Sequence, residues 1–251
     1  MLTKVAVLSD IHGMLVSLDR VLAEPEVASA DVIVVTGDHI WGPQPTEVLD
    51  RLVALGDRAI LVRGNADREV LQMSRGEDVG LNDDSVAVWG AQQLRADHQE
   101  LLDAMPERVT LDVDGFGPTL FCHATPRDDE EVALVDSRIE RWVEVLEPLP
   151  QETSTVVCGH THMPFLRLAA GRTVINPGSV GLPYGRSGAH WALLSAGGVT
   201  FRRTLIEEDA LVAGTARLSL LPIVDQWLED YVSTPATDIE VLALFGPRDG
   251  R

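Results

Sequence analysis

Five short polar segments of this sequence carry side chains that bind metal ions, and each segment follows a run of apolar residues. The segments are Ser9-Asp10-Ile11-His12-Gly13, Gly37-Asp38, Gly64-Asn65-Ala66-Asp67, Cys122-His123-Ala124-Thr125 and Gly159-His160-Thr161-His162. Their carboxylate, amide and imidazole groups are ligands for divalent metals. The apolar run before each segment predicts a buried strand, so the ligands should gather where strands end. In this order they predict two metal ions at the rim of a sheet and the hydrolysis of a phosphate ester.

Asp38 is the candidate for a ligand shared by both ions. Catalytic metal pairs lie about 3.5–4 Å apart, and such a short separation requires an anionic group between them. Asp38 lies between the segments that would serve the two sites. Two dications, less the charges of Asp10, Asp38 and a bridging hydroxide, leave a net charge of about +1. That charge would attract a phosphate anion, whereas a site richer in carboxylates would neutralise itself.

The mixture of nitrogen and oxygen ligands indicates which metals would bind. It favours Mn²⁺, with Fe, Zn²⁺ and Ni²⁺ as alternatives, over Mg²⁺ or Ca²⁺. No cysteine thiolate belongs to the ligand set, which argues against a structural zinc site. Cys122 and Cys158 have apolar neighbours and are predicted to be small buried side chains rather than a disulfide.

The first third of the chain predicts parallel strands. Apolar runs at residues 4–9, 32–35 and 59–62 are separated by two helical patterns, at 15–22 and 47–55, with Thr46 as the expected cap of the second helix. Strands that alternate with helices pair in parallel through right-handed crossovers. Ligands in such sheets collect at the carboxyl ends of the strands. Asp10 and His12, two residues apart, should point to the same side of an extended backbone.

The remainder of the chain is predicted to complete a single domain over residues 1–251. Residues 68–114 are more polar and are interpreted either as a lid that shapes the substrate site or as scaffold, with one helix at 97–105. Strands are expected at 119–122 and 155–158, with a helix at 139–146 between them. From Arg172 the pattern changes to hairpin-like strands at 173–175, 189–194 and 199–204. A helical tail is expected at 205–251, with helices at 224–231 and 239–245.

The charge and hydropathy of the chain restrict its partners. The net charge is −19, with only 20 Lys and Arg residues among 251, which argues against binding a nucleic-acid polymer. A small phosphorylated substrate remains compatible with this charge, because the metal ions act locally. We find no signal peptide and no apolar run of the roughly 20 residues that span a membrane. The expectation is a cytoplasmic protein, and homo-oligomerisation is left open.

The ligand set resembles that of the calcineurin-like metallophosphoesterases, and the resemblance covers nearly the whole chain. Gly42-Pro43, Pro126-Arg127-Asp128 and residues 176–181 are similar to the small single-domain bacterial branch. The resemblance implies an α/β fold in which two mixed sheets are sandwiched between helices in four layers. It also implies the ligands of each ion and a reaction in which a metal-bridging hydroxide attacks the phosphate. One ion would be held by Asp10, His12, Asp38 and His162, the other by Asp38, Asn65, His123 and His160, with Asp38, Asn65 and His123 as the catalytic residues.

One position departs from the family pattern. Many members have a histidine after the Gly-Asn pair that assists the leaving group, and this chain has Ala66. A methyl group cannot donate a proton, so the preference between diesters and monoesters stays open.

Asn65 is also a candidate substrate contact, and the other candidates have ordinary alternatives. His39 could face the substrate or be a solvated loop residue. Arg127 and Arg63 could contact phosphate or pair with nearby acids such as Asp128 and Asp67. His98 is expected on a helix surface and His190 in strand packing.

The predicted function is hydrolysis of small phosphodiesters, phosphomonoesters or nucleotides. The alternatives are a dinucleoside polyphosphate hydrolase, a phosphoprotein phosphatase, and a protein-binding scaffold without catalysis. A scaffold should have lost metal ligands, and here all seven positions are intact.

Overall fold

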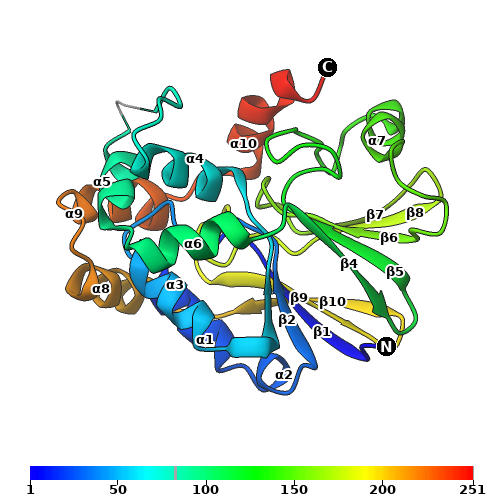
Figure 1. The fold of residues 1–251 in the computed structure, drawn as a ribbon, viewed down its shortest axis with the longest axis horizontal. Coiled ribbons are helices and arrows are strands. Elements are labelled where there is room, and N and C mark those ends of the chain that lie inside the picture. The colour runs from blue at the N-terminus through cyan, green and yellow to red at the C-terminus, as the bar shows by residue number, and fades with distance from the viewer. Residues whose placement is uncertain (82–83, 251) are drawn as a thin grey trace.

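The computed structural model of the chain describes residues 1–81 and 84–250 and contains two five-stranded sheets that pack face to face (Figure 1). Helices cover the outer face of each sheet. The fold class implied by the resemblance is therefore confirmed, and the four layers run helices, sheet, sheet, helices.

The first sheet contains the three parallel strands predicted from the amino-terminal sequence. Its strand order is β10-β9-β1-β2-β3. The parallel strands are β1 (Lys4–Leu8), β2 (Val32–Val35) and β3 (Ala59–Leu61), and the antiparallel hairpin consists of β9 (Ala189–Ser195) and β10 (Gly198–Thr204). The helices between the parallel strands are α1 (Leu15–Leu22), the short α2 (Pro25–Ala28) and α3 (Pro45–Val53), with a 3₁₀ turn at Gly56–Arg58. Thr46 is not the cap of α3. Gln44 precedes the helix, Pro45 starts it, and the Thr46 hydroxyl bonds to the Glu47 side chain.

The second sheet has the strand order β4-β5-β6-β8-β7. Its strands are β4 (Arg108–Val113), β5 (Gly117–Cys122), β6 (Thr155–Val157), β7 (Phe165–Ala169) and β8 (Arg172–Asn176). β5, β6 and β8 are parallel, whereas β4 and β7 run antiparallel at the two edges. Helix α7 (Ile139–Leu146) covers the outer face. Neither edge strand was predicted from the sequence, because side chains at the edge of a sheet are partly exposed and their apolar pattern is weaker.

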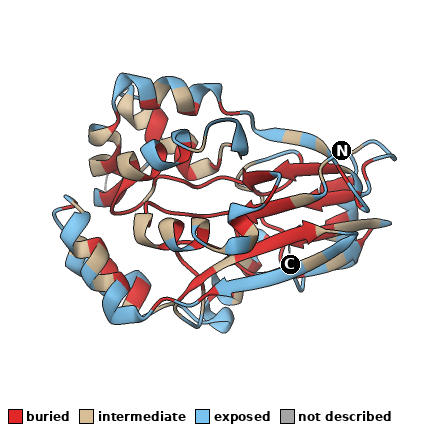
Figure 2. Ribbon diagram, turned by 90° about the horizontal axis from the view of Figure 1, so that it is seen from below, coloured by how far each residue is buried: buried red, intermediate tan, exposed pale blue. Residues whose placement is uncertain are grey.

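Strand residues alternate between the space between the two sheets and the space under the outer helices, and this alternation divides the core. In β1, Val5 and Val7 point between the sheets, while Ala6 and Leu8 point toward the helices on the outside. Cys122 and Cys158 are buried under α7 as the small apolar side chains that the sequence predicted. Figure 2 shows the buried strands running between helices whose outer surfaces are exposed.

Residues 65–104 contain more helix than the one segment predicted there. The helices are α4 (Asn65–Ser74), α5 (Ser85–Gln93) and α6 (Ala96–Ala104); Asn82 and Asp83 lie outside the described residues. His98 on α6 is 2% exposed and bonds to Asp50 at 2.9 Å, so the prediction of a surface histidine was wrong. The prediction overlooked that α6 packs its short apolar face, with Leu102, against the neighbouring helices.

The tail contains helices near the two predicted positions, 224–231 and 239–245, and one further helix, α8 (Glu208–Leu218), that was not predicted. The other elements of the tail are α9 (Val224–Leu228), a π-helical turn (Glu229–Ser233), α10 (Asp238–Phe245) and a 3₁₀ turn (Gly246–Arg248). Within the described ranges, every helix is too short or too polar to cross a lipid bilayer.

Candidate metal centre

The seven predicted ligands come from both sheets and meet at the ends of their strands. Asp10 and His12 follow β1, Asp38 follows β2, and Asn65 begins α4 after β3. His123 follows β5, and the pair His160 and His162 follows β6. The centre thus lies on the seam between the two sheets, at the carboxyl ends of parallel strands, where α/β sheets bind ligands.

The backbone at these ligands is not extended, which corrects the predicted conformation of Asp10 and His12. Five of the seven ligands have positive φ angles: 54° at Asp10, 50° at His12, 54° at Asp38, 65° at His160 and 54° at His162. A non-glycine residue in this left-handed region costs on the order of 1 kcal/mol or more, and such residues concentrate at functional sites. The curled backbone brings both side chains of an Asp-x-His or His-x-His pair into the same site.

Asp10, His12 and His162 form the first ligand group, and all three are buried. The Nε2 atoms of His12 and His162 are 3.1 Å apart, and His162 Nε2 lies 3.3 Å from Asp10 Oδ1. The backbone N–H of His160 donates to both oxygens of Asp10, at 3.1 and 3.2 Å. That interaction joins the loop after β6 directly to the loop after β1.

Asp38, His123 and His160 form the second group, also buried, with Asn65 beside it. His123 Nε2 lies 3.3 Å from Asp38 Oδ1 and 3.1 Å from Asn65 Oδ1. The other carboxylate oxygen, Asp38 Oδ2, faces the first group, 3.7 Å from His12 Nε2. Asp38 thus presents one oxygen to each group, which is the arrangement required of a bridging ligand.

The imidazole rings are oriented by backbone carbonyl groups. The Nδ1–H of His12 donates to Trp41 O (3.1 Å), that of His123 to Thr36 O (2.7 Å) and that of His162 to Leu182 O (2.9 Å). With Nδ1 directed at a carbonyl, each ring points its Nε2 atom toward the ligand group, where it can bind a cation once it carries no proton. His160 Nε2 is buried and has no hydrogen-bond partner among the described residues. These four nitrogens, with the two carboxylates and the Asn65 amide, fit a pair of divalent ions.

The electrostatic field of the centre keeps its carboxylates ionised. Burial raises the pKa of Asp38, but His123 and His12 more than offset this and hold it well below its usual range. Burial lowers the pKa of His123, whereas the neighbouring Asp38 raises it to about 10. Burial and then His123 lower the pKa of His160 to about 4. His160 is therefore neutral at physiological pH, the form in which imidazole binds a metal.

Asp67 fixes the relative position of Asp38 and Asn65, a role that the sequence analysis missed. Its Oδ1 accepts the backbone N–H of His39 at 2.8 Å, and its Oδ2 accepts His39 Nδ1–H at 2.6 Å and the Gly64 N–H at 2.9 Å. The loops after β2 and β3 are joined in this way. The signal available in the sequence is an acid three residues after Gly64, a spacing at which a side chain can reach back to the start of a helix.

His39 and the two arginines singled out from the sequence have protein partners. His39 is completely buried, so its interpretation as a solvated loop residue was wrong. Arg127 pairs with Glu131 and Glu144, with nitrogen–oxygen distances of 2.8 Å to each, and Arg63 lies 3.4 Å from Glu107. These acids differ from the ones expected. His190 lies on β9 and is partly buried.

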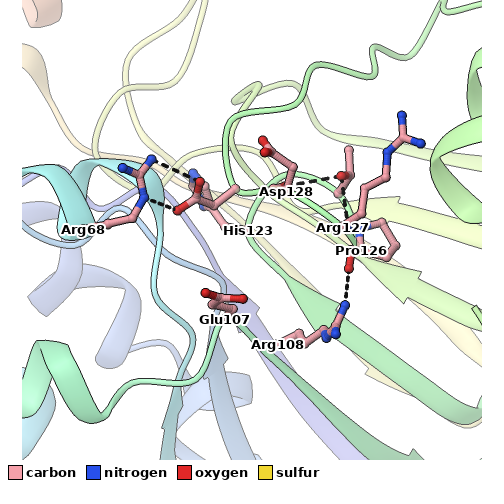
Figure 3. A pocket seen from close by; sticks show the side chains of 9 residues that line it. Arg68, Glu107, Arg108, His123, Pro126, Arg127 and Asp128 are labelled. Atoms are coloured by element: carbon pink, nitrogen blue, oxygen red, sulfur yellow. Dashed lines mark hydrogen bonds and ion pairs between the residues drawn. The ribbon is translucent and has the colours of Figure 1, made fainter. Parts of the chain in front are cut away.

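A pocket of about 230 Å³ opens beside His123 and offers space for a substrate. Figure 3 shows it between α4 on one side and the start of β4 on the other, lined by Arg68, Glu107, Arg108, Thr125, Pro126, Arg127, Asp128 and Asp129. The Arg68 guanidinium binds both oxygens of Asp129, at 2.8 and 3.2 Å, and also contacts Glu130. The Arg108 guanidinium donates to the Pro126 carbonyl.

Next to this pocket, Glu69 should make stability depend on pH. Burial and then a hydrogen bond with Glu130 raise the pKa of Glu69 to about 7, against an ordinary value of 4.5. The folded protein therefore holds a proton that the unfolded chain has lost, and the free energy of unfolding falls as pH rises from about 5 to 7. We expect Glu69→Gln, which cannot ionise, to raise the free energy of unfolding at pH 8 by about 1–2 kcal/mol, allowing for solvent screening. At pH 4.5 it should have little effect.

Urea unfolding of both proteins at the two pH values, in metal-free buffer, measures this difference. Glu100→Gln, at an exposed position on α6, is the matched control and should behave alike at both pH values. An equal effect of Glu69→Gln at pH 4.5 and pH 8 would contradict the assignment.

The chain is similar to a known family and to several individual proteins. The family model described as calcineurin-like phosphoesterase superfamily domain matches residues 3–197. The phosphodiesterase YfcE of Escherichia coli K12 is 29% identical over 197 residues, which cover 74% of this chain and 84% of YfcE.

Two solved structures share the fold. A metallophosphoesterase from Sphaerobacter thermophilus superposes with a TM-score of 0.67 at 23% identity, covering 85% of this chain and 93% of the other. The hypothetical protein PH1004 from Pyrococcus horikoshii gives a TM-score of 0.76 at 18% identity, covering 93% of this chain and 99% of PH1004.

Proposed function

Since the chain belongs to the calcineurin-like phosphoesterase superfamily and is a hydrolase of phosphate esters, we propose that it cleaves small phosphodiesters or phosphomonoesters at a pair of divalent metal ions. The observation that carries the proposal is the position of Asp38, which turns one oxygen toward each of two buried ligand groups. The relative YfcE, named a phosphodiesterase, favours diesters as the first class to test.

Each ligand group would hold one ion. Asp10, His12, His162 and one oxygen of Asp38 would bind the first, and the other oxygen of Asp38 with Asn65, His123 and His160 would bind the second. When bound, two such ions supply a nucleophilic water oxygen and polarise the phosphoryl group. The mixed donor set supports Mn²⁺, with Fe, Zn²⁺ and Ni²⁺ as alternatives.

The protein contributes orientation and charge to this chemistry. The carbonyls of Thr36, Trp41 and Leu182 fix three imidazole rings, so the ligands need little rearrangement when a cation arrives. The Ala66 N–H donates to Asp38 Oδ1 at 2.9 Å, which holds the bridging carboxylate in place.

The alternative functions considered from the sequence differ in their substrate and in whether the protein hydrolyses a substrate at all. A dinucleoside polyphosphate hydrolase and a phosphoprotein phosphatase would use the same ions on other substrates. A protein-binding scaffold has no need of a ligand set whose seven members converge, and this convergence favours catalysis.

Metal loading combined with a substrate panel tests the proposal. We expect metal-free protein loaded with Mn²⁺ to retain two equivalents per chain after desalting, measured by elemental analysis. It should then hydrolyse bis(p-nitrophenyl) phosphate, with p-nitrophenyl phosphate, cyclic nucleotides, diadenosine polyphosphates and a phosphopeptide as the comparison. One equivalent or fewer would reject the metal pair. Two equivalents without turnover of any ester would favour the scaffold instead.

A further inference from the structure

Partly exposed aromatic side chains gather around the metal centre. The chain has only five Trp, two Tyr and five Phe residues, and half of them are buried in the core. Six keep some exposed surface. Three of these, Trp41, Tyr184 and Phe245, lie at the centre, and a fourth, Tyr231, packs on Trp41. A protein so poor in aromatic residues would not place them here by chance, so the site favours contact with planar or apolar groups.

Three of these rings contact metal-ligand histidines directly. Tyr184 stacks on His162 with ring centroids 5.3 Å apart and an interplanar angle of 18°. Trp41 meets His12 edge to face at 5.6 Å, and Phe245 lies 5.8 Å from His160. Both ligand groups therefore have an aromatic ring at their side.

Phe245 comes from a part of the chain outside residues 3–197, the part that the family model matches. The segment that follows it is fastened to the loop after His123. Asp249 is 2% exposed and bonds to Ser137, Arg248 Nη2 donates to Glu130 O at 3.3 Å, and Arg138 Nη2 donates to Gly250 O at 3.0 Å. These bonds hold the ring of Phe245 in a fixed place at the metal centre.

The substrate class follows from these positions, and the inference rests on the proposed function. Ions held by the two ligand groups would bind a phosphate beside the rings of Tyr184 and Phe245. Partly exposed aromatic rings gain free energy when they stack on another planar ring, and a nucleobase has such a face whatever its sequence. We propose that the metal centre takes phosphate esters that carry a planar aromatic group, a nucleoside or an aryl group, and that Tyr184 and Phe245 bind this group by stacking.

Phosphonates of equal size separate stacking from simple apolar contact. Phenylphosphonate and cyclohexylphosphonate each have a ring of six carbons, but only the phenyl ring is planar. Neither compound can be hydrolysed as an ester. We expect Mn²⁺-loaded protein to bind phenylphosphonate about 5-fold more tightly than cyclohexylphosphonate in a calorimetric titration. Phe245→Leu and Tyr184→Leu should each reduce that ratio toward one without changing the Mn²⁺ content.

Two control variants are compared with the two leucine variants. Phe245→Tyr retains a ring and should retain the ratio. Phe201→Leu removes a partly exposed ring on β10 that has no contact with the ligand histidines among the described residues, and it should also leave the ratio unchanged.

The outcomes distinguish this inference from the proposed function. Equal affinity for the two phosphonates in the wild type, or an unchanged ratio in both leucine variants, would overturn it. Loss of Mn²⁺ from Phe245→Leu would mean that this ring stabilises the ligands, and the stacking role of Phe245 would fall. A clear phenyl preference in a protein that hydrolyses no ester would leave the aromatic site standing and reject the proposed function.

Discussion

Asp38→Asn should lower kcat on the best phosphate ester by on the order of 10³-fold, the size of loss that follows removal of a charge-stabilising group from an active site. Asn keeps the shape of the side chain but carries no negative charge, so the two ions would repel each other without compensation. Metal content should also fall, toward one equivalent. Steady-state kinetics and elemental analysis of the same preparation measure both effects.

Asn65→Ala is the matched comparison, because it removes a neutral ligand that serves only the second group. We expect it to cost less activity than Asp38→Asn, at about 10–100-fold. Near wild-type turnover by Asp38→Asn with both metals bound would show that Asp38 does not bridge them. Circular dichroism of each variant checks that the fold is intact.

Ala66→His should increase turnover of esters with poor leaving groups by about 10²-fold, within the range that a positioned proton donor contributes. Departure of an alkoxide develops charge on the ester oxygen, and the wild type has only a methyl group at this position. Its rate should therefore fall steeply as the pKa of the leaving group rises across a series of aryl and alkyl esters. In Ala66→His the same series should give a shallower slope.

A flat dependence in the wild type, measured where the chemical step limits the rate, would mean that another group already donates the proton. His39 is a poor candidate, because its ring is completely buried against Asp67. Glu69, one turn beyond Asn65 on α4, would be the first residue to replace. Ala66→Gln provides a variant of similar bulk that cannot act as a general acid.

The parts of the fold that were predicted from sequence are those in which local pattern and burial agree. β1 and β2 are buried on both faces, so their residues form unbroken apolar runs. β4 was missed because Arg108, Thr110 and Asp112 are exposed at the edge of the sheet, which dilutes its apolar pattern.

The ligands of the candidate centre could be named because each has a distinctive chemical type after a predicted strand. The backbone conformation of these ligands could not be predicted. Extended geometry is the default for Asp10 and His12 next to a strand, and only contacts with other loops, such as the Asp10 N–H bond to Gly37 O, hold the left-handed form. Asp67 and Phe245 were missed for a related reason. Phe245 contacts His160 and Asp67 contacts His39 because the tertiary fold brings them together. Only the bond from Gly64 N–H to Asp67 follows a local spacing.

The position of the metal centre on the seam between the two sheets affects how the molecule unfolds. His160 N–H and the Asp10 carboxylate, 150 positions apart in the chain, are hydrogen-bonded there, and each metal ion would tie further distant segments together. Ions bound in this way would act as removable cross-links between two halves of the molecule. Their contribution to stability grows with the free metal concentration, because ligands that bind only the folded state shift the folding equilibrium. The supply of metal in its surroundings would then set the stability of the folded chain as well as its catalytic rate.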